Sequence, residues 1–119
     1  MFAETLREVV DGTEGAIASL LMDFEGIAVE SYAKDRDAFD IDVVGAEFSV
    51  IVKSVRRAIE SLDAGETKEM AVQADKVVTL IRVLNSDYFV ALTMRPTANL
   101  GKGRFMLRVA VPKLLQELE

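Results

Sequence analysis

The chain has 119 residues, of which 50% are hydrophobic and 29% are charged, and its net charge is −6. A chain of this length can bury roughly two thirds of its unfolded surface, so we expect one globular domain over residues 1–119. The acidic balance argues against a nucleic-acid binder, which needs a basic stripe to displace phosphate counterions. The sequence contains neither cysteine nor histidine. Disulfides, thiolate nucleophiles, Cys/His zinc sites and histidine general bases are therefore excluded.

The start of the chain and its apolar runs predict a cytoplasmic protein. Acidic residues appear as early as Glu4 and Glu8, which does not suit a secretory signal. The longest apolar run, Gly15 to Met22, is broken by Ser19 and is too short to cross a bilayer. We therefore expect no membrane insertion.

The first third of the chain predicts a helix and a hairpin. Apolar residues from Phe2 to Val10 recur at helical spacing, and Gly12 ends the pattern. Residues 15–22 are apolar on both faces, which is typical of a central strand covered from both sides. A turn at 23–26, in which Gly26 suits a positive φ, leads into a second strand over 27–34.

A polar link over 35–40 precedes a long helix predicted for residues 42–62, with Asp40 or Asp42 as its cap. This helix carries a wide apolar face that we expect to lie on the sheet; it comprises Val44, Phe48, Ile51, Val52, Val55, Ile59 and Leu62. Beside it runs a stripe of mostly small residues, which would let another helix approach closely. The stripe comprises Ala46, Val50, Ser54 and Ser61, interrupted by Arg57.

The last part of the chain predicts three strands and a helix. Runs over 67–74, 77–84 and 88–95 are separated by short polar links, which favour antiparallel hairpins. The first run alternates and has polar ends, so we expect it at an edge, with Glu69, Ala71 and Gln73 on one face. The final helix covers residues 100–118 and contains Pro112, which predicts a kink and a missing bond to the Arg108 carbonyl.

The predicted order is α-β-β-α-β-β-β-α. Central strands that are apolar on both faces need cover on both sides, which gives a three-layer sandwich of the α/β (α+β) class.

This order resembles the roadblock / dynein light-chain family, which includes bacterial regulators of Ras-like GTPases. The matching pieces are the strand and tight turn over 17–29, the small-residue flank of the long helix, and the opening of the last helix. That opening reads Asn99-Leu100-Gly101-Lys102-Gly103-Arg104 and is followed by Leu107-Arg108. An uninterrupted last helix is usual in the family, and Pro112 departs from it.

The resemblance implies a five-stranded antiparallel sheet with the long helix on one face and the two terminal helices on the other. It also implies a homodimer in which edge strands pair and long helices pack together. The dimer-interface residues that it implies are Ala46, Val50, Ser54, Arg57, Ser61, Glu69, Ala71 and Gln73. The alternative is that the small residues are simply tolerated on the surface.

Four charged residues of the long helix are candidates for binding a protein partner: Lys53, Arg56, Arg57 and Glu60. Two alternatives remain open for the arginines. They could be solvated charges paired with Glu60, or an arginine finger that acts on a GTPase.

Two apparent ligand motifs fail, so no cofactor or metal is expected. Gly101-Lys102-Gly103 lacks the spacing and the hydroxyl of a phosphate-binding loop. The cluster Asp35, Asp37, Asp40 and Asp42 lacks the glycine and glutamate of a calcium loop, and it places Phe39 where a carboxylate is needed.

The first hypothesis is a roadblock homodimer, not an enzyme, that binds a small Ras-like GTPase and modulates its nucleotide state. The alternative is a scaffold subunit of a motor, polarity or trafficking complex with no effect on GTP turnover.

Overall fold

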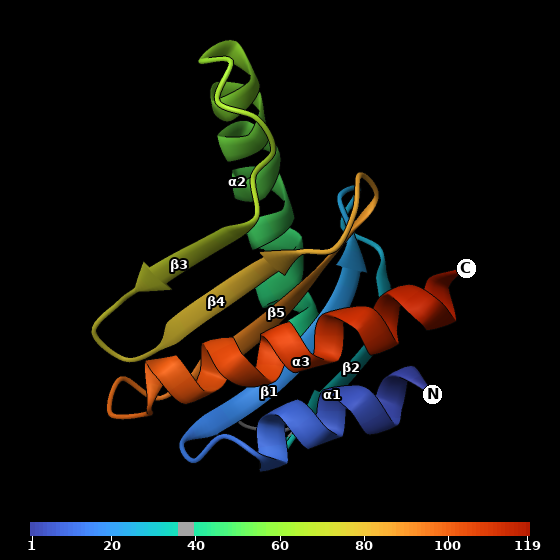
Figure 1. Cartoon of the computed structure of the whole chain (residues 1–119). Helices are drawn as coiled ribbons and strands as arrows, with labels where there is room; N and C mark the ends of the chain where they lie inside the picture. Colours follow the sequence, from blue (N-terminus) through green and yellow to red (C-terminus); the bar gives the residue numbers. More distant parts are fainter. Residues whose placement is uncertain (36–39) are drawn as a thin grey trace.

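The computed structural model describes residues 1–35 and 40–119 (Figure 1). Three helices and five strands follow one another in the predicted order. The helices are α1 (Phe2–Asp11), α2 (Ile41–Ser61) and α3 (Leu100–Leu118). The strands are β1 (Ala16–Asp23), β2 (Ala28–Ala33), β3 (Glu69–Gln73), β4 (Val78–Val83) and β5 (Tyr88–Met94). The expectations that concern Asp37 and Phe39 fall outside the described residues.

The five strands form one antiparallel sheet in the order β2-β1-β5-β4-β3. The predicted fold class is confirmed, because α1 and α3 cover one face of this sheet and α2 lies on the other (Figure 1). Two predicted strand positions are also confirmed: β3 is an edge strand, and β1 is interior.

The face under α1 and α3 is a continuous apolar core. Leu6, Val10, Leu92 and Leu114 are fully buried in it. Ser19 of β1 donates a buried hydrogen bond from Oγ to the Leu6 carbonyl at 3.0 Å, which ties α1 to the sheet. Packing and a satisfied buried polar group therefore fix this layer.

Two glycines let helices approach the sheet closely, one on each face. A Cβ at Gly45 of α2 would overlap Leu20 Cδ2 and would lie 2.9 Å from Met22 Cε. A Cβ at Gly103 of α3 would lie 2.9 Å from Met94 Sδ. Gly103 in the opening of α3 is thus a packing position.

Side chains cap both long helices. Asp40 accepts hydrogen bonds from the backbone N–H groups of Asp42 and Val43, so Asp40 is the cap of α2. Asn99 accepts a hydrogen bond from the Lys102 N–H at 3.0 Å. Each cap satisfies donors that have no partner within the helix.

The expectation that the whole apolar face of α2 lies on the sheet is wrong. The helix is anchored by Ile41, Gly45, Ser49 and Val52, which are buried. The part beyond Val52 projects past the sheet (Figure 1) and has no buried residue. Helix α2 packs mainly over β1 and β2, and it is longer than the part of the sheet on which it rests.

Helix α3 continues through Pro112 to Leu118. Proline has no N–H, so the Arg108 carbonyl receives no bond from it. Both residues are exposed, so this carbonyl lies on the solvent side of the helix.

Candidate functional site

The outward face of α2 presents small and apolar side chains to solvent. Each predicted dimer-interface residue of this helix (Ala46, Val50, Ser54, Arg57 and Ser61) is exposed. The sequence analysis missed Val43, which lies seven positions before Val50 on the same face and is 57% exposed. Val50 itself is 66% exposed. Large apolar side chains are rarely left exposed side by side on a monomer, so this stripe is a candidate interface.

Two further apolar residues extend this surface along one side. Ile51 is 45% exposed and Leu62 is 74% exposed, although both belong to the apolar face that was predicted to lie on the sheet. Leu62 lies beyond Val52, the last buried residue of α2, and the Ile51 side chain is turned about 100° around the helix axis from that of Val52. We call Val43, Val50, Ile51 and Leu62, together with the stripe of small residues, the α2 surface.

The free edge of β3 is the second element of the candidate site. In the part of the chain that the structure describes, β3 pairs with β4 alone, which leaves one row of its backbone groups unpaired. Glu69, Ala71 and Gln73 alternate on one face and are exposed. Glu69 is also an ion-pair partner within the chain, since its Oε1 lies 3.1 Å from Nε of Arg104 on α3. An unpaired edge is a template for a strand of another chain.

The four predicted partner-binding residues share one side of α2 by their spacing, but their contacts differ. Arg57 and Glu60 are exposed. Lys53 Nζ lies 3.7 Å from Oε1 of Glu25 in the β1–β2 turn. Lys53 and Glu25 are both largely exposed, so their ion pair adds little stability.

Arg56 holds α2 against two turns of the sheet. Its guanidinium lies 4.1 Å from the centroid of the Phe24 ring, and it donates a hydrogen bond from Nη1 to the Ser86 carbonyl at 3.2 Å. Phe24 is buried and packs on Phe89, with the ring centroids 5.3 Å apart. These contacts, not a pairing with Glu60, occupy Arg56, so part of its role is to join α2 to both turns.

Proteins of known structure share this fold. No family model matches the sequence, and no curated protein matches it either. Among solved structures, the chain is similar to MglC from Myxococcus xanthus, with 36% identity over 96% of each chain and a TM-score of 0.69. It is also similar to a Roadblock/LC7 domain from Streptomyces avermitilis, with 16% identity, a TM-score of 0.86 and coverage of 97% of this chain and 95% of that one. The chain belongs to the roadblock family.

A third roadblock structure is MglB with a tetrameric arrangement. It is 19% identical, covers 95% of this chain and 84% of its own, and superposes with a TM-score of 0.85. At this identity the likeness concerns the fold alone. It shows that the layers, the sheet order and the long α2 are those of a roadblock domain.

The roadblock domain has a cleft of about 800 Å³ beneath the projecting part of α2. Arg56 and Glu60 line it from α2, and Thr67, Lys68 and Arg82 line it from the segment before β3 and from β4. The hydroxyl of Thr67 is buried there without a hydrogen-bond partner among the described residues. Its lining includes the cations Arg56, Lys68 and Arg82 and the carboxylates Glu60 and Glu66, so charges of both signs border the cleft.

The described part of the chain contains no group of three carboxylates close enough to hold a metal ion. No helix within those same residues is both long and apolar enough to span a membrane. The features that stand out are therefore the α2 surface and the free edge of β3, and both suit contact with protein.

Proposed function

We propose that this roadblock domain is a homodimeric adaptor of the cytoplasm that binds a small Ras-like GTPase and modulates its nucleotide state, without being an enzyme itself. The observation that carries the proposal is the α2 surface, in which four large apolar side chains are 40% exposed or more. Burying them removes apolar area from water, which is the main favourable contribution to most protein association.

The shape of the α2 surface favours a twofold partner. A twofold contact places the same patch on both chains, and small side chains such as Ala46 and Ser54 let two helices approach within about 8–10 Å. The unpaired edge of β3 supports the same assembly, because strand pairing between two copies would satisfy its free backbone groups.

The GTPase part of the proposal is supported by the family. The roadblock family, which the sequence resembles, includes bacterial regulators of Ras-like GTPases. A regulator of this kind acts by binding one switch conformation more tightly than the other, which shifts the population of the GTPase. Arg57 and Glu60 are accessible for such a contact.

The first experiment measures self-association. Light scattering on the purified chain is expected to give twice the monomer mass of 13.1 kDa. Val50→Asp places a charge at the centre of the α2 surface and should yield the monomer. Val109→Asp is the matched control, since Val109 is also an exposed valine but lies on α3. A wild-type monomer, or equal effects of the two variants, would contradict the assignment of the α2 surface.

The second experiment tests the partner. A Ras-like GTPase from the same genome, loaded with GDP or with a non-hydrolysable GTP analogue, is titrated with the wild-type dimer while GTP turnover is followed. If the chain is a regulator, we expect that its binding to the GTPase depends on the bound nucleotide and that GTP turnover or nucleotide exchange changes. Binding that is equal for both nucleotides, with no change in turnover, would instead identify a scaffold.

A further inference from the structure

The outer face of α3 carries an exposed apolar strip on the side of the molecule opposite α2. Phe105 is 49% exposed and Val109 is 42% exposed, and Pro112 follows at the next helical turn. The spacings of four and three residues place these side chains in one line along the helix. The opposite side of α3 packs on the sheet through Gly103, Leu107, Ala110 and Leu114, which are buried. Core packing therefore does not account for the strip.

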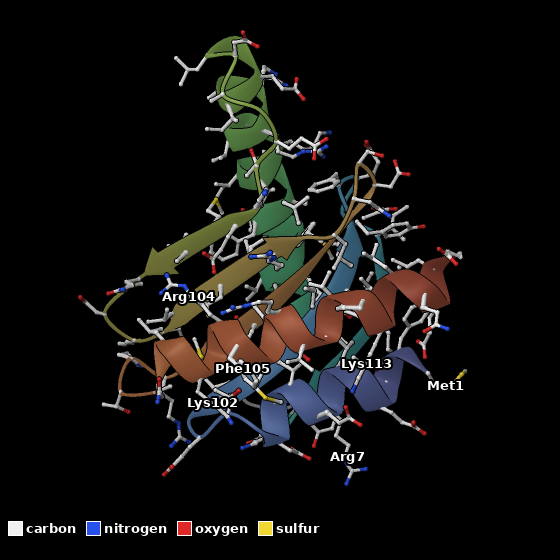
Figure 2. The ribbon with its side chains drawn as sticks, in the orientation of Figure 1. Met1, Arg7, Lys102, Arg104, Phe105 and Lys113 are labelled. Atoms are coloured by element: carbon white, nitrogen blue, oxygen red, sulfur yellow. The ribbon has the colours of Figure 1, made fainter. Side chains whose placement is uncertain are left out.

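Cations border this strip on both sides. Between Leu100 and Gln116 the helix carries Lys102, Arg104, Arg108 and Lys113 and no carboxylate, although the chain as a whole has a net charge of −6. Figure 2 shows Lys102, Phe105 and Lys113 along the outward side of α3. The charge of the molecule is thus divided unevenly, with a cationic, partly apolar face on an acidic domain.

Two of these cations form ion pairs with carboxylates of the chain, and two form none with the described residues. Arg104 pairs with Glu69 at 3.1 Å, and Lys113 Nζ lies 3.1 Å from Glu8 Oε2. Lys102 and Arg108 form no ion pair with any residue that the structure describes. The ammonium of Lys102 lies 5.6 Å from the centroid of the Phe105 ring, so one cation and the central aromatic residue are already next to each other.

We propose that the outer face of α3 binds an acidic amphipathic segment of a partner protein. Apolar side chains of that segment would cover Phe105 and Val109, while its carboxylates would pair with Lys102 and Arg108. This combination of an apolar anchor and flanking charges is how amphipathic helices dock on protein surfaces, and the charges set the choice of partner.

The same observations argue against a second copy of the chain as the occupant. A twofold contact of α3 with α3 would bring two sets of cations together, and like charges across an interface are unfavourable. A flat anionic membrane fits poorly as well. Helix α1 lies beside α3 in the same layer (Figure 1) and exposes Glu4, Glu8 and Asp11. A segment one helix wide, about 10–12 Å across, can contact α3 and avoid these carboxylates.

This inference does not depend on the proposed function. The α2 surface and the α3 face lie on opposite sides of the sheet, so each can be tested while the other stays intact.

The test uses two synthetic helical peptides of about 18 residues, or five turns. Both carry leucines at helical spacing; one carries glutamates at the flanking positions and the other carries lysines. We expect the acidic peptide to bind saturably, more weakly at higher salt, and to shift the amide resonances of α3 in the ¹⁵N-labelled full chain. The lysine peptide should bind at least tenfold more weakly.

Variants locate the contact. Phe105→Ser combined with Val109→Ser, and separately Lys102→Glu combined with Arg108→Glu, should each weaken binding of the acidic peptide about tenfold or more. These positions are exposed, so the fold should survive, which circular dichroism checks. Val50→Ser combined with Leu62→Ser on the α2 surface is the matched control and should leave the affinity unchanged.

Three results would overturn the proposal. The first is no difference between the acidic and lysine peptides. The second is resonance shifts on α2 in place of α3. The third is that the chain binds vesicles of one part phosphatidylserine and three parts phosphatidylcholine, that the α3 variants abolish this binding, and that the acidic peptide fails to bind. This result would assign the face to a membrane. None of these results alters the self-association test of the α2 surface.

Discussion

The two helical layers of this roadblock domain are built differently, although they cover the same sheet. In the layer of α1 and α3, both helices lie along the sheet and bury side chains against it, such as Leu6 of α1 and Leu114 of α3. In the other layer, α2 is anchored by its residues up to Val52, and the part beyond Val52 leaves the sheet. One layer is supported by the sheet along both helices, and the other extends past the sheet and leaves apolar side chains at the end of α2 exposed.

The difference between the two layers follows from the length of α2 and from the strands that it contacts. Helix α2 has 21 residues, which corresponds to about 32 Å, and it packs mainly over β1 and β2. The helix is amphipathic along its whole length, but the sheet covers only part of its apolar face. Amphipathicity therefore predicts that a face will be buried, and it does not say which molecule will bury it.

The largest expected effect comes from truncating a leucine in each layer. Leu114→Ala in α3 removes a fully buried side chain and should lower the free energy of unfolding by about 3 kcal/mol. Leu62→Ala at the exposed end of α2 should change it by less than about 0.5 kcal/mol in the monomeric Val50→Asp background. Urea unfolding followed by circular dichroism measures both values. Equal losses would mean that α2 is as well supported as α3.

The second prediction compares the two glycine contacts. Gly45→Ala should cost about 2 kcal/mol, because its Cβ would overlap Leu20 within the buried core. Gly103→Ala should be close to neutral, since the end of the Met94 side chain can shift and alanine favours the helix by about 1 kcal/mol over glycine. Thermal unfolding of the two variants is the measurement. A larger loss at Gly103 would show that the α3 contact is the tighter of the two.

The smallest difference in unfolding free energy between the two layers is expected at the helix caps. Asp40→Ala and Asn99→Ala should each lower the free energy of unfolding by about 1 kcal/mol, because each leaves backbone donors without a side-chain partner. Hydrogen exchange sharpens the comparison: Asp40→Ala should speed exchange in the first turn of α2, while the end of α2 beyond Val52 should exchange fast in the wild type and in the variant alike, because it has little packing to hold it. Asn99→Ala should affect only the first turn of α3. Faster exchange along all of α3 would contradict this contrast.

The order of elements, the fold class and the edge position of β3 could be predicted from the sequence. Each depends on local patterns, such as the uninterrupted apolar run of β1 and the alternation of β3. The small-residue stripe of α2 was also predictable as an exposed face, since Ala46, Val50 and Ser54 recur every four residues.

Other features depend on tertiary placement that no local pattern contains. Ile51 belongs to the same predicted apolar face as the buried Val52 but points about 100° away from it, and Leu62 lies beyond the part of α2 that the sheet covers. The contacts of Arg56 with Phe24 and Ser86 join residues about thirty positions apart. The exposed strip of α3 could have been recognised in part from the sequence, because Phe105 and Val109 lie between cations. Phe105 taken alone, however, is equally compatible with a core position.

The placement of α2 and α3 on opposite sides of the sheet has a consequence for valency. Two chains joined through α2 would carry two identical α3 faces, one from each copy. A partner that is itself paired or clustered could engage both faces at once, and its second contact would form at an effective concentration set by the distance between them. Modest affinity at each α3 face would then suffice for firm attachment, and dispersal of the partner would release it.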